Sequence, residues 1–318
     1  YCSDHSNGFV SVLPRSHACF LPLKKLNECY DAACSLQQIQ DDFMSVNDLN
    51  DNDVALIGIM SDANSSYKRG AAEAPAFIRR ALHSGSSNLC SETGVDLAGN
   101  ARFVDVGDRQ VKDDPESFLA IEDEINQLTA KGASPLVLGG DHAISYPVLR
   151  AIHGTHGPVN VLHFDAHPDL YDDYEGNPWS HASPFARIME DGLASRLVQV
   201  GIRTLSEHLR SQAERFGVEI HEMRNLDTSV IGHDFEGPVY ISCDIDALDP
   251  AYAPAVSHLE PGGLSVRDIL SIVQRLPNRI VGADIVEYNP RRDINDMTAM
   301  VAAKLLKEIA GRKLLNAV

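Results

Sequence analysis

Short apolar segments rich in β-branched residues recur along this chain from Val54 onward, with helical patterns between them. Polar loops bound each segment, as expected of strands that are buried on both faces of a sheet. Strands that alternate with helices predict a parallel sheet covered by helices on both sides. The predicted strands are residues 54–60, 102–106, 135–138, 159–165, 197–202, 239–245 and 279–286, and the predicted helices include 74–82 and about 115–131.

The chain of 318 residues, 44% of them hydrophobic, is long enough to bury the core of one large α/β domain. That main domain is predicted to cover residues 53–318. Residues 1–52 are predicted to form an N-terminal arm with a helix and a linker, because helix-like apolar spacing over 21–44 is followed by the polar stretch 45–53.

The formal net charge of −18 argues against a nucleic-acid partner and an anionic membrane surface, and it is compatible with a small cationic substrate. No apolar run approaches the roughly 18 residues that a membrane-spanning helix needs. The six cysteines include no CxxC pair, so we expect reduced thiols and an intracellular protein, cytoplasmic or mitochondrial. Because the sequence does not begin with Met, the native N-terminus and a targeting peptide can lie outside it.

Six ligand-type side chains follow three of the predicted strands. The densest stretch is Phe164-Asp165-Ala166-His167-Pro168-Asp169, where three of them recur at every second residue and can face one side of a strand end. The carboxyl ends of parallel strands meet at one edge of the sheet, which is where α/β proteins carry their function. The six residues are His142, Asp165, His167, Asp169, Asp244 and Asp246.

Each of these residues has an ordinary structural interpretation when taken alone. A single Asp after a strand is most often a helix N-cap or a turn former, and a lone His most often forms a hydrogen bond in the core or at the surface. Six polar groups gathered at one buried edge would be costly without a cation, however. Carboxylates and imidazoles without thiolate suit Mn²⁺ or a similar divalent ion, and the set is too large for one ion. Two metal ions that share carboxylates are therefore predicted, and such a pair can lower the pKa of a water for hydrolysis.

The residues beside these six are predicted to support the site without binding metal. Asp141, Asp249 and Asp284 are interpreted as turn residues or as partners of the ligands. His163 lies inside the predicted strand 159–165 and is expected to face away from the site.

Two further residues point to the substrate. Glu287 follows the predicted strand 279–286 and exceeds the metal-ligand set, so its carboxylate suits a cationic substrate rich in hydrogen-bond donors, such as a guanidinium. A surface ion pair is the alternative. His181 lies in a loop before a helix, where it could pass a proton to a leaving amine, and a helix-capping or surface role is the alternative.

Five separated motifs together resemble the ureohydrolase family, which contains the arginases and agmatinases, and they match it in order from about residue 54 to residue 309. The resemblance implies a three-layer α/β/α fold with an eight-stranded parallel sheet, two Mn²⁺ ions, urea as a product, and a homo-oligomer, trimeric or hexameric. Ni²⁺ is the alternative metal. The motifs are Gly139-Gly140-Asp141-His142, Asp165-Ala166-His167-Pro168-Asp169, Ser180-His181-Ala182-Ser183, Asp244-Ile245-Asp246-Ala247-Leu248-Asp249-Pro250 and Glu287-Tyr288-Asn289-Pro290.

The resemblance also implies a role for each site residue. Glu287 would hold the guanidinium and His181 would move protons as the amine leaves. Asp165 and Asp244 would bridge the two ions. One ion would be bound by His142, Asp165, Asp169 and Asp244, and the other by His167, Asp165, Asp244 and Asp246.

Residues 174–183 and 256–264 look most like those of plant-type arginases, which favours hydrolysis of L-arginine to L-ornithine. Animal-type arginases carry two aspartates around the substrate's α-amino group where this chain has Thr204 and Ser206. Agmatine, which would give putrescine, therefore stays an alternative, as do 4-guanidinobutyrate and guanidine. A rival reaction is formimino-group hydrolysis, and the alternative outside catalysis is a metal-bound regulatory relative.

Asn177, Trp179 and His258 are the residues predicted to line the substrate pocket. Trp179 is the only tryptophan, and two interpretations of it are open. It either narrows the mouth of the pocket or packs as a rigid anchor of its loop.

Overall fold

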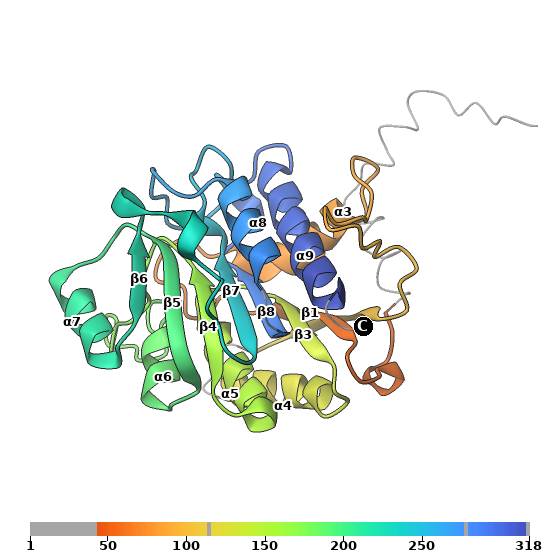
Figure 1. The fold of residues 1–318 in the computed structure, drawn as a ribbon, viewed down its shortest axis with the longest axis horizontal. Helices are drawn as coiled ribbons and strands as arrows, with labels where there is room; N and C mark the ends of the chain where they lie inside the picture. Colours follow the sequence, from red (N-terminus) through yellow and green to blue (C-terminus); the bar gives the residue numbers. More distant parts are fainter. Residues whose placement is uncertain (1–42, 113–115, 277–278, 316–318) are drawn as a thin grey trace, which may run out of the picture. The chain divides into compact units, whose positions relative to one another are not determined.

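The structure, a computed structural model, describes residues 43–112, 116–276 and 279–315. Its centre is an eight-stranded sheet with the order β2-β1-β3-β8-β7-β4-β5-β6, in which all pairs of neighbours are parallel (Figure 1). The strands are β1 (Val54–Met60), β2 (Phe103–Gln110), β3 (Ser134–Leu138), β4 (Val159–Phe164), β5 (Ala194–Ile202), β6 (Glu219–Glu222), β7 (Val239–Asp244) and β8 (Ile280–Val286).

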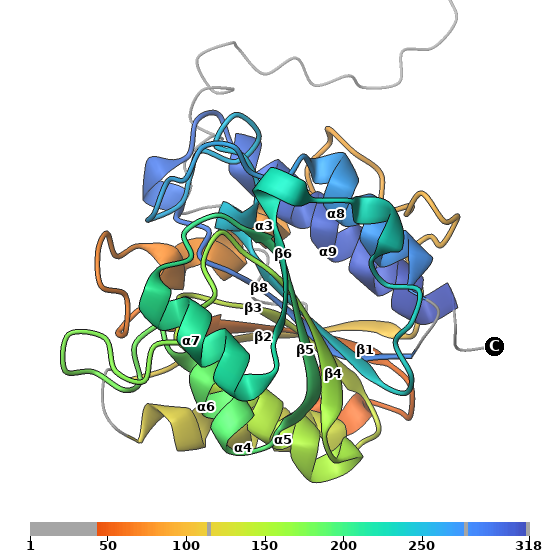
Figure 2. The ribbon, with the colours of Figure 1, turned by 60° about the vertical axis from the view of Figure 1, so that its left-hand side comes forward.

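Helices cover the sheet on both sides, which gives the predicted three layers (Figures 1 and 2). One side carries α3 (Ala74–Leu82), α8 (Val266–Arg275) and α9 (Met297–Leu315). The other side carries α4 (Ser117–Thr129), α5 (Ser145–His156), α6 (Pro184–Glu190) and α7 (Glu207–Phe216). Short 3₁₀ helices are η3 (Val46–Asp48), η4 (Ala71–Glu73), η5 (His142–Ile144), η6 (Met223–Asn225), η7 (Thr228–Val230), η8 (Ile245–Ala247) and η9 (Pro290–Arg292).

The apolar strands supply both core layers because their side chains alternate between the two faces. In β1, Leu56 packs in the core under α3, α8 and α9, while its neighbour Ile57 packs in the core under α4 to α7. Leu136 and Val137 of β3 divide in the same way. A strand that is apolar at every position is therefore expected for a parallel sheet with two covered faces.

The predicted α/β/α fold is confirmed, and the bounds of β1 and α3 match the predictions. The predicted strands missed β6, whose residues Glu219–Glu222 are mostly polar and only half-buried because β6 lies at the edge of the sheet. The predicted helix over 21–44 lies almost wholly outside the described residues. The arm of residues 1–52 therefore stays a prediction, as does its boundary with residues 53–318.

Residues 43–49 pack against the sheet ahead of β1. Met44 donates its backbone N–H to Asp105 O in β2 at 2.9 Å, and Leu49 is buried in the core. Arg79 lies over the ring of Phe43 and is itself buried, where it pairs with Asp105 and Asp108. In the ranges that the structure describes, none of the helices combines the length and apolar character needed to cross a membrane.

The strand order brings together four segments that are far apart in the sequence. Strands β3, β8, β7 and β4 are consecutive neighbours in the centre of the sheet, and His142, Glu287, Asp244 and Asp165 stand at their carboxyl ends. Residues from four motifs thus meet at one edge because the strands that carry them pair with one another.

Gly140 makes the turn after β3 possible, and its substitution tests that geometry. A Cβ at Gly140 would overlap the backbone carbonyl oxygen of Ser61, so Gly140→Ala must move one of the two backbones. We expect the free energy of unfolding, measured by urea denaturation, to fall by about 3 kcal/mol, the upper end of the range for overpacking.

The matched control is Gly154→Ala in α5, where a Cβ would meet no atom within 4 Å. Helix propensity predicts that this variant is as stable as the parent or more stable by roughly 0.5–1 kcal/mol. Equal stability of the two variants would contradict the close approach at Gly140.

Candidate metal centre

The ring of His142 points into a group of three carboxylates. Its Nδ1 lies 3.2 Å from Asp165 Oδ2, 3.1 Å from Asp169 Oδ2 and 3.2 Å from Asp244 Oδ2. All four side chains are buried, yet His142 Nδ1 has no hydrogen bond of acceptable geometry with any residue that the structure describes. A buried nitrogen that faces three carboxylates in this way suits a metal ion between them.

The other side of the His142 ring shows which nitrogen carries the proton. Asp284 accepts hydrogen bonds from the hydroxyls of Ser145, Tyr240 and Ser242, each at 2.7 Å. Because the Ser242 hydroxyl gives its proton to Asp284, it must accept from His142 Nε2, which is 2.9 Å away. In neutral His142 the lone pair is therefore on Nδ1 and faces the carboxylates, as metal-binding histidines require. Asp284, which the sequence indicates is a turn residue or a partner of the ligands, is thus joined to His142 through Ser242.

A second cluster shares Asp165 with the first. His167 Nδ1 lies 3.1 Å from Asp246 Oδ2 and 3.4 Å from Asp165 Oδ1, whereas His142 faces the other oxygen, Oδ2, of Asp165. Backbone groups hold these carboxylates in place, since Asp165 Oδ1 accepts from His167 N at 2.6 Å and Asp244 Oδ1 accepts from Asp246 N at 2.7 Å. The six predicted ligands thus form two adjoining clusters that meet at Asp165.

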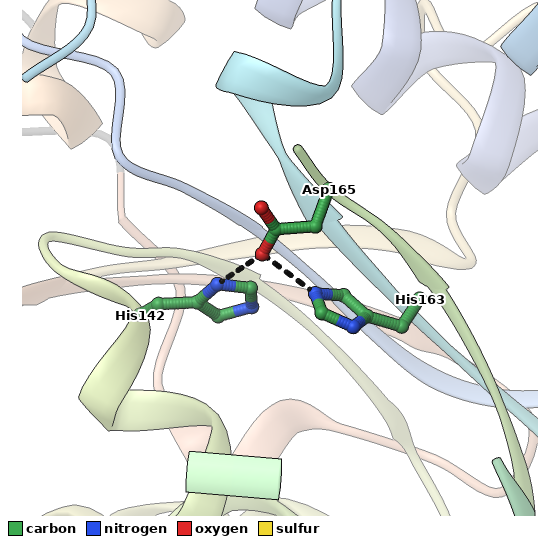
Figure 3. A group of neighbouring side chains, drawn as sticks. All are labelled: His142, His163 and Asp165. Atoms are coloured by element: carbon green, nitrogen blue, oxygen red, sulfur yellow. Dashed lines mark hydrogen bonds and ion pairs between the residues drawn. The ribbon is translucent and has the colours of Figure 1, made fainter. Parts of the chain in front are cut away.

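The prediction that His163 faces away from the site is wrong. His163 Nε2 lies 2.8 Å from Asp165 Oδ2, and Figure 3 shows the rings of His142 and His163 on either side of this carboxylate. Gln199 Nε2 donates to His163 Nδ1 at 3.0 Å and to Pro168 O at 2.7 Å. Since Nδ1 accepts from an amide, neutral His163 carries its proton on Nε2 and donates it to Asp165. His163 therefore orients Asp165 and has no lone pair free for a metal.

The alternation of a strand does not fix where a long side chain ends. His163 and Asp165 are two residues apart and lie on the same side of β4, which is why the imidazole reaches the carboxylate. The ring of His163 also stacks on Phe185 at a centroid distance of 3.8 Å. Burial lowers the pKa of His163, which keeps the ring neutral and able to donate.

Burial and crowding raise the pKa of two carboxyl groups. The pKa of Asp246 rises to about 6, mainly because it is buried. Burial and then the carboxylates of Asp246 and Asp165 raise the pKa of Asp244 well above its ordinary value. Burial lowers the pKa of His142 and His167, but the nearby carboxylates outweigh it and raise both well above the ordinary value. The site therefore attracts positive charge, for which protons and divalent cations compete.

Glu287 and His181 form a buried pair beside the clusters. Glu287 Oε1 accepts from His142 N at 2.9 Å and lies 3.1 Å from His181 Nδ1. In the described part of the chain, no hydrogen bond or ion pair involves Oε2 of Glu287. Burial lowers the pKa of His181, but the hydrogen bond and charge of Glu287 raise it to about 9, so the ring is an imidazolium at neutral pH. The alternative of a surface ion pair does not fit Glu287, which is 3% exposed.

Two site residues adopt a backbone conformation that side chains other than Gly rarely take. Asp169 has φ of 50° and Glu287 has φ of 64°. Such a conformation costs of order 1–3 kcal/mol per residue and persists where the surrounding structure imposes it. Here it directs both carboxylates toward the same edge of the sheet.

A cavity of about 180 Å³ opens onto the clusters. His258 belongs to its wall, and the His258 ring stacks on that of His181 at a centroid distance of 5.2 Å. The lining residues are Ser66, His167, Pro168, Asp169, Tyr171, Tyr174, His181, Ala182, Thr204, Leu209, Asp244, Asp246, His258 and Glu287.

Asn177 and Trp179 are not among the described residues that line this cavity. Asn177 Nδ2 donates to Asn64 Oδ1 at 3.1 Å and so joins the loop of His181 to the loop after β1. Trp179 is 46% exposed and stacks on Tyr146, with Phe118 at its edge. This packing is that of a loop anchor, the second of the two interpretations of Trp179.

The two positions that differ from animal-type arginases have different surroundings. Thr204 lines the cavity, and its Oγ1 donates to Ala166 O at 3.1 Å. Ser206 is the N-cap of α7, where its hydroxyl accepts from Leu209 N. Ser206 therefore stabilises the N-terminus of α7.

Sequence reasoning missed three residues of the site. Gln199 fixes the tautomer of His163, Ser242 fixes that of His142, and Ser66 contacts His181. The signal for the first two is a polar residue inside an otherwise apolar strand, which costs stability unless it has a partner. Ser66 lies in an exposed polar loop, where nothing local distinguishes it.

The sequence matches a known family over most of its length. The Arginase family model covers residues 52–311 of this chain. The chain belongs to the Arginase family. Members of this family are ureohydrolases that cleave a guanidino C–N bond and depend on two metal ions.

Plant arginases are similar to this chain over most of its length. Arginase 1, mitochondrial, of Arabidopsis thaliana is 49% identical over 275 residues, which is 81% of this chain and 80% of the relative. The solved arginase from Medicago truncatula has a TM-score of 0.80 and 43% identity, and the match covers 91% of this chain and 98% of that one. Two further relatives are each 37% identical to this chain over 273 residues, which is 81% of this chain. One is the "Guanidino acid hydrolase, mitochondrial" of Homo sapiens, of which the match covers 77%. The other is the "Agmatinase, mitochondrial" of Gallus gallus, of which it covers 80%.

The assignment of Asp244 to metal binding can be tested against a nearby aspartate. Asp244→Asn replaces a buried carboxylate beside His142 by a neutral amide, so elemental analysis is expected to show that most of the bound metal is lost. The control is Asp249→Asn, because Asp249 accepts from the backbone N–H groups of Ala251, Gly262 and Gly263 in a turn. Equal metal content in the two variants would remove Asp244 from the ligand set.

Proposed function

We propose that this ureohydrolase is an arginase that converts L-arginine and water to L-ornithine and urea. The observation that carries the proposal is the position of the Glu287–His181 pair, which adjoins two carboxylate–imidazole clusters at the wall of one cavity. The Glu287 carboxylate can hold a guanidinium, and the His181 imidazolium can give a proton. The two clusters can hold the metal ions that supply a nucleophile. The greater similarity to plant arginases than to the agmatinase and the guanidino acid hydrolase supports arginine as the substrate.

We propose two Mn²⁺ ions as the metals. The unprotonated Nδ1 of neutral His142 and the surplus of carboxylates fit such ions, and Ni²⁺ is the alternative. When bound, two divalent ions supply hydroxide for hydrolysis by lowering the pKa of water. The first ion is assigned to His142, Asp165, Asp169 and Asp244, and the second to His167, Asp165, Asp244 and Asp246.

Glu287 is assigned to the guanidinium of the substrate. Its Oε1 already accepts from His142 N and His181, and Oε2 can accept from guanidinium N–H groups. The fixed backbone of Glu287 and its burial hold the carboxylate in one place, which orients the carbon that is attacked.

His181 is assigned to the proton that the leaving amine requires. An arginine guanidinium and water have the same total charge as an ornithine ammonium and urea, so protons move within the site and the reaction releases none. His181, protonated at neutral pH beside Glu287, can give a proton to the amine nitrogen as the C–N bond breaks.

Assembly and location are proposed with the activity. A homo-oligomer, trimeric or hexameric, is proposed from the resemblance to ureohydrolases, and sedimentation would measure its mass. A mitochondrial location is proposed because the similar plant arginases are named mitochondrial.

The first experiment measures urea release by protein loaded separately with Mn²⁺ and Ni²⁺, with L-arginine, agmatine, 4-guanidinobutyrate and guanidine as parallel substrates. We expect the highest kcat/KM for L-arginine with Mn²⁺. A preference for one of the other three compounds would keep the chemistry and refute arginine as the substrate. Absence of urea in every reaction would refute the enzyme and favour a metal-bound regulatory protein.

His181→Ala should slow urea release by roughly 10²–10⁴-fold, the usual range for a group that transfers protons. Metal content should not change, because the side chain of His181 contacts Glu287 and Ser66 and none of the six proposed ligands. Unchanged turnover would return His181 to the structural role that was its alternative.

A further inference from the structure

The Nε2 atom of His181 has a partner that the proposed reaction does not yet use. Ser66 Oγ lies 2.8 Å from His181 Nε2, on the opposite side of the ring from Glu287. Ser66 is exposed and belongs to the wall of the cavity. It lies in the polar loop between β1 and η4, more than a hundred positions from His181 in the sequence.

The backbone of this loop also holds His181. Asn64 O accepts from His181 N at 3.2 Å, and Asn64 Oδ1 accepts from Asn177 Nδ2 at 3.1 Å. Asn64 N in turn donates to Asp141 Oδ2 at 2.8 Å. The loop is thus fixed next to His142 at one end and carries Ser66 to the ring of His181 at the other.

The chemistry of a hydroxyl suits a ring that gains and loses a proton. Glu287 only accepts, so the hydrogen bond to it requires a proton on His181 Nδ1. In the imidazolium, Nε2 also carries a proton and Ser66 accepts it. When His181 is neutral with its proton on Nδ1, the Ser66 hydroxyl can rotate and donate to Nε2. The same contact is therefore available in both protonation states.

We propose that Ser66 is a positioning residue that holds the His181 ring through Nε2 in both of its protonation states. Glu287 holds one ring nitrogen, Ser66 the other, and His258 stacks against the ring. The proton that His181 gives leaves from Nε2, so the Nε2–H must turn from Ser66 to the amine nitrogen during the transfer, and the Ser66 hydroxyl donates to Nε2 afterwards. A ring held at both nitrogens before and after this step stays in place in the cavity. The kinetic part of this inference rests on the proposed arginase activity.

The kinetic test compares Ser66→Ala with Ser65→Ala. Ser65 is the adjacent residue, and in the described part of the chain its side chain forms no hydrogen bond with His181. Ser66→Ala is expected to lower kcat for L-arginine by up to about 10²-fold, the cost of a misplaced reacting group, with KM nearly unchanged. Ser66→Thr should restore most of the rate because it restores a hydroxyl, and Ser65→Ala should behave as the parent. A raised KM at normal kcat would instead make Ser66 a substrate contact and overturn the proposal.

A double-mutant cycle separates positioning from a general loss of structure. If Ser66 acts through His181, then Ser66→Ala should have no further effect in a His181→Ala background. Multiplicative effects of the two substitutions would overturn the proposal.

A measurement without turnover keeps this inference separate from the activity. In ¹⁵N-histidine-labelled protein loaded with diamagnetic Zn²⁺, the His181 ring signals are assigned by their loss in His181→Ala. The Nε2 shift should move in Ser66→Ala, return in Ser66→Thr and stay in place in Ser65→Ala; an Nε2 shift that ignores Ser66 would refute the contact. If arginine is not hydrolysed but the shift responds, the proposed function fails while the positioning role of Ser66 stands.

Discussion

The rest of the site depends on Asp165, whose two carboxylate oxygens face the imidazoles of His142 and His167. Further carboxylates surround both imidazoles. Four buried acids at one edge of a sheet repel one another, and each would cost several kcal/mol if left charged without a partner. A cation resolves that conflict only if every donor atom faces inward. Ser242 accepts a hydrogen bond from His142, and His163 donates one to Asp165. Asp284 holds Ser242 and Gln199 holds His163, so these four residues turn the donor atoms inward.

The parallel sheet brings these side chains together at a small cost in backbone entropy. The proposed ligands stand at the ends of β3, β4 and β7, and Glu287 follows β8, so no long loop must be ordered to bring them together. The left-handed backbone at Asp169 and Glu287 is a local cost that the large core on both faces of the sheet can bear. The loop after β1 then adds the contacts around His181, so the group proposed to transfer protons also depends on a fifth strand.

The fold, and the gathering of the six candidate ligands at one edge of the sheet, could be predicted because both depend on short local stretches of sequence. The apolar strands are continuous, and a ligand at a strand end needs only the strand to be placed. The contacts that could not be predicted depend on how far side chains extend in space. The His163 ring contacts Asp165, and Trp179 packs on Tyr146 outside the cavity. Ser66, on the loop after β1, contacts His181 on the loop after β4. Spacing along one strand says nothing about such distances, and a loop serine has no pattern that separates it from its neighbours.

The edge strand β6, which the sequence pattern did not predict, affects how the sheet can associate with other chains. An edge strand exposes unpaired backbone groups, to which a strand of another chain can add. At β6 the side chains beside those groups are charged or titratable, with Glu219 paired to Arg196 and to His221. A strand that joined this edge would have to bury or break those ion pairs. The polarity that conceals β6 from a search for apolar strands is therefore also a barrier to aggregation through the open side of the sheet.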